Sequence, residues 1–226
     1  MKAIILAAGM GTRMRPLTDQ LPKPLLSVGG KPLIVWHLER LQRNGFKEVV
    51  INIAWLGHMI PALLGDGERF GLSIHYSDEQ AESALETAGG IVKTLSFFDN
   101  EPFLVLSADI WCDYEYLPIS PIQNGDLGHL ILVDNPQHHP EGDFSLSAGR
   151  VSSGGVPKKT YSGISYFHPE LFKSLSYGKR ALAPVMREAM ARQQISGEHH
   201  SGQWWDIGTP ERLALLDAQL LAKSSS

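Results

Sequence analysis

Two glycines and two basic residues near the start of the chain have the spacing of a phosphate-binding site. The segment LAAGMGTRMRPLT follows a short apolar run and places Gly9, Gly11 and Arg13 close together. Glycines allow backbone N–H groups to approach a phosphate closely, and an arginine adds positive charge. Lys23, held between two prolines, supplies a second cation. These residues predict a site for a phosphorylated ligand.

Two common kinds of phosphate loop do not fit this segment. A dinucleotide-binding loop needs G-x-G-x-x-G, but Met14 stands where the third glycine would allow close packing of the helix. A Walker loop needs G-x-x-x-x-G-K-[ST], and the chain contains no such run. Hydride transfer is therefore disfavoured. The remaining interpretation is a loop whose backbone and Arg13 hold phosphate directly.

Apolar runs alternate with amphipathic segments through the first half of the chain. We expect strands at 2–7, 48–54, 72–76 and 103–106, and helices at 32–45, 55–64 and 86–98. This order is typical of an α/β fold with one Rossmann-like, mostly parallel sheet and helices on both faces. Such sheets bind ligands beyond the carboxyl ends of their strands. Asp109 follows the fourth strand and is therefore expected beside the glycine loop.

The second half of the chain is less regular and richer in predicted strands. We expect strands at 130–133 and 161–167, a hairpin over 143–153, and helices at 182–193 and 211–223. The absence of internal repeats or long linkers favours a single domain over residues 1–223. We expect a nucleotide-binding part over about 1–112 and a small β-rich part over about 113–223, with residues 224–226 fraying. Without a hexapeptide repeat to build a β-helix, we expect a monomer.

Composition excludes several classes of protein. The chain has 226 residues and a net charge of −4, which disfavours nucleic-acid binding. No run approaches the roughly 18 apolar residues of a membrane span, so we expect no membrane partner. Cys112 is the single cysteine, so no disulfide can form within the chain. A reducing, cytoplasmic location fits these observations.

Longer motifs resemble those of one enzyme family. LAAGMGTRMRPLT followed by PKPL is similar to the G-x-G-[ST]-R and P-K signature of the sugar-1-phosphate nucleotidylyltransferases. The resemblance continues through LETAGGI, LVLSADIW, VDNPQHHPEGDF, YSGIS and WWDIGTPERL. It implies a GT-A-like fold, a nucleoside triphosphate and a sugar 1-phosphate as substrates, and Mg²⁺ as cofactor. Within this family, the VDNPQHH and SGEHHSGQWWDIGT segments and the short chain imply transfer of UMP from UTP to N-acetylmuramate 1-phosphate, as in peptidoglycan recycling.

The resemblance also implies roles for individual residues. Arg13 and Lys23 would be catalytic, and Asp109 and Asp206 would hold the metal. The nucleotide would contact Ala8, Gly9, Gly11, Thr12, Arg13, Lys23, Glu79, Glu86 and Thr87. The sugar part would contact Ser107, Gly142, Asp143, Ser162 and Gly163. Ser107 and Ala108 stand where the family often has Asn and Gly.

Several alternatives stay open at this stage. Thymidylyl transfer to glucose 1-phosphate and guanylyl transfer to mannose 1-phosphate use the same motifs, and a non-catalytic sugar-nucleotide sensor could share the fold. Lys158 and Lys159 are either contacts for a muramate carboxylate or a solvated basic turn. The pairs His138-His139 and His199-His200 are not expected to chelate a metal on their own, because neighbours in a strand point to opposite faces. Cys112 is expected to be inert.

Overall fold

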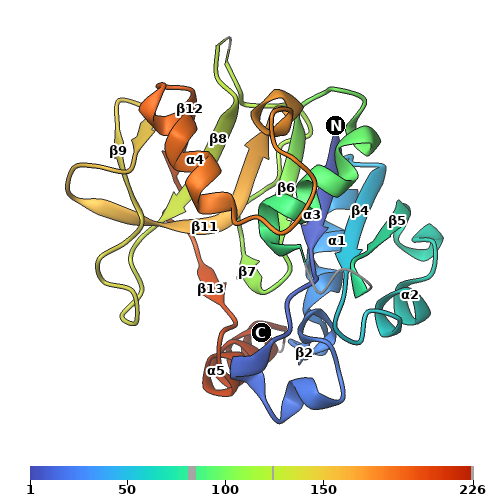
Figure 1. The fold of residues 1–226 in the computed structure, drawn as a ribbon. Helices are drawn as coiled ribbons and strands as arrows, with labels where there is room; N and C mark the ends of the chain where they lie inside the picture. Colours follow the sequence, from blue (N-terminus) through green and yellow to red (C-terminus); the bar gives the residue numbers. More distant parts are fainter. Residues whose placement is uncertain (81–84, 124, 225–226) are drawn as a thin grey trace.

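A mixed β-sheet runs through the whole molecule (Figure 1). This computed structural model describes residues 1–80, 85–123 and 125–224. Among these residues, nine strands form the main sheet. In spatial order they are β5 (Ser73–Asp78), β4 (Glu48–Ile53), β1 (Lys2–Leu6), β6 (Phe103–Ser107), β11 (Lys158–Phe167), β8 (Gly128–Val133), β12 (Ile195–His199), β10 (Arg150–Ser152) and β9 (Phe144–Ser147).

The first half of this sheet is parallel and covered by helices on both faces. Strands β5, β4, β1 and β6 all run in the same direction. Alternate residues of β1 point to opposite faces: Ala3 and Ile5 pack in one apolar cluster with helix α1 (Leu33–Arg43), and Ile4 packs in another with α3 (Glu86–Thr94) and α4 (Leu182–Ala191). Strands buried on both faces need continuous apolar runs, which explains why this half was predictable.

The second half of the sheet is largely antiparallel. Strand β11 runs antiparallel to β6, β8 and β9, whereas β12 runs parallel to β8. Because β9 pairs with both β10 and β11, the strands β11, β8, β12, β10 and β9 close into a ring. The α/β class is confirmed, but the sheet is mixed rather than mostly parallel. The tight turn at Ala148 and Gly149 joins β9 to β10, and such short connections permit only antiparallel pairing.

Two small sheets and two further helices complete the fold. The pairs are β2 (Ser27–Val28) with β3 (Lys31–Pro32), and β7 (Ile110–Cys112) with β13 (Trp204–Asp206). Helix α2 (Met59–Leu64) is shorter than predicted, and α5 (Pro210–Ser224) packs at the carboxyl end of the chain beside the N-terminal loop (Figure 1). Strands β7, β12 and β13 were not predicted. No helix within the described ranges is long and apolar enough to cross a membrane.

The division into two parts near residue 112 stays a prediction. One sheet continues through both parts, because β11 of the second part pairs with β6 of the first. Residues 224–226 were predicted to fray. Residue 224 is the last residue of α5, and residues 225–226 lie outside the described residues.

Candidate active site

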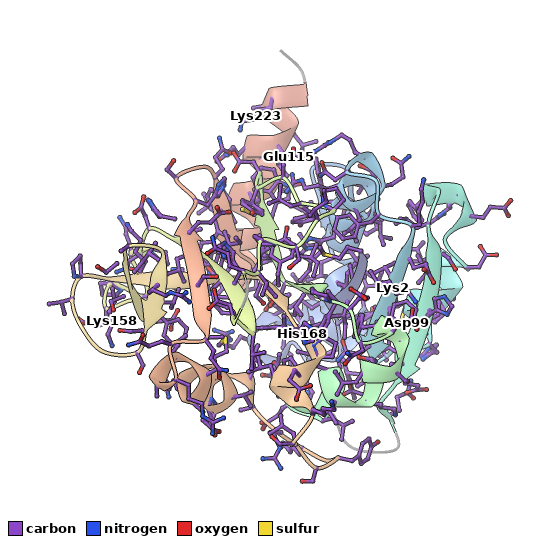
Figure 2. The ribbon with its side chains drawn as sticks, turned by 90° about the horizontal axis from the view of Figure 1, so that it is seen from above. Lys2, Asp99, Glu115, Lys158, His168 and Lys223 are labelled. Atoms are coloured by element: carbon purple, nitrogen blue, oxygen red, sulfur yellow. The ribbon has the colours of Figure 1, made fainter. Side chains whose placement is uncertain are left out.

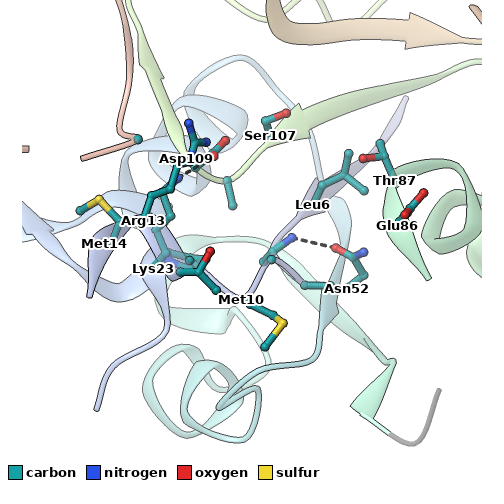
Figure 3. A pocket seen from close by; sticks show the side chains of 18 of the residues that line it. Leu6, Met10, Arg13, Met14, Lys23, Asn52, Glu86, Thr87, Ser107 and Asp109 are labelled. Carbon is teal, nitrogen blue, oxygen red and sulfur yellow. Dashed lines mark hydrogen bonds and ion pairs between the residues drawn. The ribbon is translucent and has the colours of Figure 1, made fainter. Parts of the chain in front are cut away.

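A pocket of about 620 Å³ opens at the carboxyl ends of β1 and β6. Most of the residues predicted to bind a nucleotide line it, and Glu79 does not. In Figure 3, Arg13, Lys23 and Asp109 gather at one end of the pocket, and Glu86 and Thr87 lie at the other. The predicted residues that line the pocket are Ala8, Gly9, Gly11, Thr12, Arg13, Lys23, Glu86, Thr87, Ser107 and Asp109.

The glycine loop between β1 and the first 3-10 turn has two differently constrained glycines. Gly11 has a φ of +63°, and a Cβ there would lie 2.9 Å from the Cγ2 atom of Thr18. The Thr18 hydroxyl donates a hydrogen bond of 2.8 Å to the Gly11 carbonyl. A Cβ at Gly9, in contrast, would meet nothing within 4 Å. Gly11 therefore shapes the loop, while Gly9 leaves a free approach from the pocket to the backbone.

Lys23 and Asp109 form an ion pair at one end of the pocket. The Nζ atom of Lys23 lies 2.6 Å from Oδ2 of Asp109. The lysine side chain is 10% exposed and the aspartate side chain 44% exposed, so the pair stands at the pocket wall. A buried lysine needs such a partner. Asp109 keeps its other carboxylate oxygen for a ligand.

Arg13 lies at the mouth of the same pocket with its side chain exposed. Within the part of the chain that the structure describes, it forms no ion pair, unlike neighbouring Arg15, which pairs with Asp19 at 3.1 Å. An unpaired guanidinium facing a pocket is suited to hold an anion.

Glu79 lies behind the pocket wall, although it was predicted to contact the nucleotide. It is fully buried and accepts hydrogen bonds from the Asn52 amide at 2.8 Å and from the Leu85 backbone N–H at 2.8 Å. Asn52, which sequence reasoning missed, lines the pocket and accepts a 2.7 Å bond from the backbone N–H of Ala7. Glu79 thus supports the loop through Asn52. Residues 81–84, between the predicted contacts Glu79 and Glu86, lie outside the described residues.

A second pocket, of about 430 Å³, adjoins the first and shares Arg13, Ser107 and Asp109 with it. Four of the predicted sugar-binding residues line it: Ser107, Asp143, Ser162 and Gly163. Asp143 accepts a 2.8 Å bond from the backbone N–H of Tyr161, which fixes its carboxylate at the wall.

Two residues predicted to contact the sugar, Ser162 and Gly142, offer no side chain to the second pocket. Ser162 is fully buried: its hydroxyl donates to the Ile131 carbonyl at 2.7 Å, and its own carbonyl accepts a 2.8 Å bond from Nε1 of Trp204. Gly142 does not line the pocket; it has a φ of +63°, and a Cβ there would lie 2.7 Å from Oδ1 of Asn135. Gly142 therefore shapes the turn that presents Asp143.

Asp206 lies beside Asp109 because β13 pairs with β7. Asp206 is opposite Ile110, and the next residue, Ile207, donates a backbone hydrogen bond of 2.8 Å to the Asp109 carbonyl. Both carboxylates line the second pocket. Carboxylate oxygens next to a phosphate-binding loop have the donor chemistry that suits Mg²⁺.

Asp206 has two partners that sequence reasoning did not single out. Nη1 of Arg212 lies 2.8 and 2.6 Å from its two carboxylate oxygens, and Nε2 of His138 lies 3.1 Å from one of them. No local pattern in the sequence links these residues, since His138 comes from a loop far away in the chain.

Lys158 and Lys159 do not line either pocket. Lys158 lies at the outer edge of the β-rich part in Figure 2. Lys159 forms a 2.8 Å ion pair with Asp134, and this hydrogen bond lowers the pKa of that carboxyl. Both lysines lie at the start of β11, paired with β9, and not in a turn, so neither the muramate contact nor the basic turn describes this segment.

Cys112, Asp113 and His200 bring their ligand atoms within 4.8 Å of one another. His200 and Asp113 form a 2.7 Å hydrogen bond. Cys112 is buried, and burial raises the pKa of its thiol to about 11. The protonated thiol is a poor metal ligand, which agrees with the expectation that Cys112 is inert.

Known proteins have sequences and folds similar to those of this chain. The family model for nucleotidyl transferases matches residues 2–126. The N-acetylmuramate alpha-1-phosphate uridylyltransferase of Neisseria meningitidis serogroup B is 49% identical over 98% of both chains, and that of Caulobacter vibrioides is 30% identical over 96% of both. A proposed glucose-1-phosphate thymidylyltransferase of Bacillus anthracis, solved with sucrose, has a TM-score of 0.86 at 23% identity and covers 98% of this chain and 95% of its own. That last likeness establishes the fold alone.

Proposed function

Since the chain belongs to the nucleotidyl transferase family, we propose that it transfers UMP from UTP to N-acetylmuramate 1-phosphate and releases pyrophosphate. The observation that carries this proposal is the pair of adjoining pockets that share Arg13, Ser107 and Asp109. Two substrates that meet at a shared wall are what a group transfer requires. The choice of uridine and muramate rests on the relative with 49% identity.

In this reaction an oxygen of the sugar 1-phosphate attacks the α-phosphorus of UTP in line, and pyrophosphate leaves. The attacking phosphate is already ionised at neutral pH, so no general base is needed. The barrier comes from bringing two anions together, and catalysis depends on positioning and charge neutralisation. Lys23 lines the first pocket, where it is paired with Asp109 of the shared wall, and would neutralise the reacting phosphates; Arg13 would hold the triphosphate.

The nucleotide fits the first pocket in one direction. The cations Arg13 and Lys23 lie at one end, and Glu86 and Thr87 lie at the other (Figure 3). We place the phosphates against the cations and the uracil at the opposite end, where the backbone of Ala8 and Gly9 offers further polar groups. The sugar then occupies the second pocket beside Asp143 and Gly163.

Asp109 and Asp206 are the residues that would hold Mg²⁺, which supplies additional neutralisation of phosphate charge when bound. In the protein itself, the backbone bond between Ile207 and Asp109 keeps the two carboxylate-bearing segments together. With UDP-N-acetylmuramate as its product, we propose that the enzyme acts in peptidoglycan recycling, in the cytoplasm and as a monomer.

The test is pyrophosphate release from UTP and Mg²⁺ with the 1-phosphates of N-acetylmuramate, N-acetylglucosamine, glucose and mannose. Asp109→Asn is assayed beside the unmodified protein. We expect fast release with the muramate phosphate and loss of activity in the variant. Release only with another sugar would overturn the substrate. Repeating the panel with TTP and GTP tests the thymidylyl and guanylyl alternatives, and no release with any pair would favour a sensor.

A further inference from the structure

Asp206 is held by a basic side chain in a tight, partly buried arrangement. The Nη1 atom of Arg212 lies within hydrogen-bond distance of both carboxylate oxygens, at 2.8 and 2.6 Å. The arginine side chain is 17% exposed and the aspartate side chain 26% exposed. His138 closes the group, with Nε2 2.5 Å from Nη1 of Arg212. Ion pairs with this degree of burial are stronger than those at an open surface.

The local backbone is shaped to allow this contact. Gly208 lies between the two residues in the chain, and a Cβ there would come within 2.1 Å of Nη2 of Arg212. Glycine is therefore needed for the guanidinium to lie across this turn. Arg212 itself sits in the first turn of α5, where its backbone N–H is 3.4 Å from the hydroxyl of Thr209. The segment from Asp206 to Arg212 is thus built around the ion pair.

Asp109 shows the same feature, since Lys23 lies 2.6 Å from its Oδ2 atom. Each of the two carboxylates assigned to the metal therefore already has a cation in contact with it. A positive charge next to a carboxylate disfavours the binding of a second cation there, because like charges repel. Lys23 faces the nucleotide pocket and has a role there, whereas Arg212 lines neither pocket and touches the site through Asp206.

We propose that Arg212 is a positioning residue that orients Asp206 in the metal-free protein and must give up part of this contact when a divalent cation binds. The inference rests on the metal role of Asp206 under the proposed function. It assigns Arg212 two opposed effects: it fixes the carboxylate for catalysis, and it weakens metal binding in the absence of substrates.

Because the two effects of Arg212 have opposite signs, the direction in which metal affinity changes tests the proposal. Mn²⁺ prefers the same oxygen ligands as Mg²⁺, and its binding to the full chain without substrates can be followed by the electron paramagnetic resonance signal of the free ion. Arg212→Gln removes the charge but keeps a hydrogen-bond donor. We expect it to bind Mn²⁺ about tenfold more tightly than the unmodified protein, and to lower kcat. Arg212→Lys should return Mn²⁺ affinity to the original value.

Two controls complete the design. Arg192→Gln removes an equal charge from an exposed pair with Glu188 on α4 and should leave Mn²⁺ affinity unchanged. The double variant that combines Asp206→Asn with Arg212→Gln should lose the tighter Mn²⁺ binding expected of Arg212→Gln. A merely structural role for Arg212 predicts the opposite sign, because disorder of Asp206 weakens the site.

Equal or weaker Mn²⁺ binding by Arg212→Gln, or no detectable binding by either protein, overturns the inference. If Asp206→Asn alone binds Mn²⁺ as well as the unmodified protein, the metal role of Asp206 fails, and this inference fails with it. Loss of binding in Asp206→Asn without a gain in Arg212→Gln overturns the inference and leaves the proposed function standing.

Discussion

The ammonium group of Lys23 lies 2.6 Å from a carboxylate oxygen of Asp109, although 86 positions separate the two residues. The contact joins the loop after β1 to the end of β6, which are neighbours in the parallel half of the sheet. It places a cation of the first pocket against a candidate metal ligand that lines both pockets.

Replacing Lys23 by glutamine should reduce kcat/KM for pyrophosphate release by about 10²–10³-fold, because the reacting phosphates lose a fixed positive charge. Stability should change little, since the 44% exposed side chain of Asp109 can be solvated. Lys31→Gln, which breaks an ion pair with Glu39 elsewhere, is the matched control. Activity within about threefold of the unmodified protein would contradict the catalytic role.

The two glycines of the first loop should respond differently to alanine. Gly11→Ala should lower the free energy of unfolding by about 1–2 kcal/mol, because its φ of +63° disfavours a side chain and Thr18 is in the way. Gly9→Ala should leave stability unchanged, since nothing lies within 4 Å of the added carbon. Its kcat/KM should nevertheless fall about 10²-fold, because the methyl group keeps the nucleotide from the backbone. Urea unfolding and initial rates measure the two effects, and equal loss of stability in both variants would be inconsistent with this assignment.

Asn52→Ala should destabilise the protein by about 2–3 kcal/mol, because it removes a donor from the buried carboxylate of Glu79 and an acceptor from Ala7. The pocket wall should loosen as well, which raises the KM for UTP. Thermal unfolding and a UTP titration check these expectations, with exposed Gln20→Ala as the control. Unchanged stability together with a raised KM would instead point to direct contact between Asn52 and the nucleotide.

His37 should make the protein less stable in mild acid. It is buried against the hydroxyl of Tyr116, and burial lowers the pKa of its imidazole from 6.5 to about 4. Below pH 6.5 the unfolded chain therefore takes up a proton that the folded protein does not, so stability is present above this pH and is lost as the pH falls towards 4. The loss amounts to about 3 kcal/mol for this residue.

Urea unfolding at pH 7 and pH 5 measures the part of this loss that falls between these pH values, about 2 kcal/mol. His37→Asn should be less stable than the unmodified protein at neutral pH, because it leaves a cavity, but its stability should depend less on pH across this window. An unchanged slope in the variant would show that other groups carry the acid sensitivity; buried His129, whose pKa is also lowered by burial, is the first of these.

Much of the nucleotide pocket could be predicted from the sequence. The apolar run of β1 and the glycine loop indicate a buried parallel strand that ends at a phosphate site, and Asp109 follows another such strand. Because parallel strands present their carboxyl ends at one edge, placing these residues together needed no knowledge of side-chain contacts. The roles of these residues at that edge remain predictions.

Tertiary structure alone decided the rest. Apolar periodicity does not say which strands pair, so the ring that β9 closes by pairing with β11 was not foreseen. Glu79 was expected at the nucleotide, but the fold buries it behind Asn52, since a carboxylate can lie inside only where donors converge on it. The contacts of Asp206 with Arg212 and His138 likewise depend on a turn and a distant loop meeting in space. Local sequence determines which groups a strand end presents, whereas long-range packing determines what those groups touch.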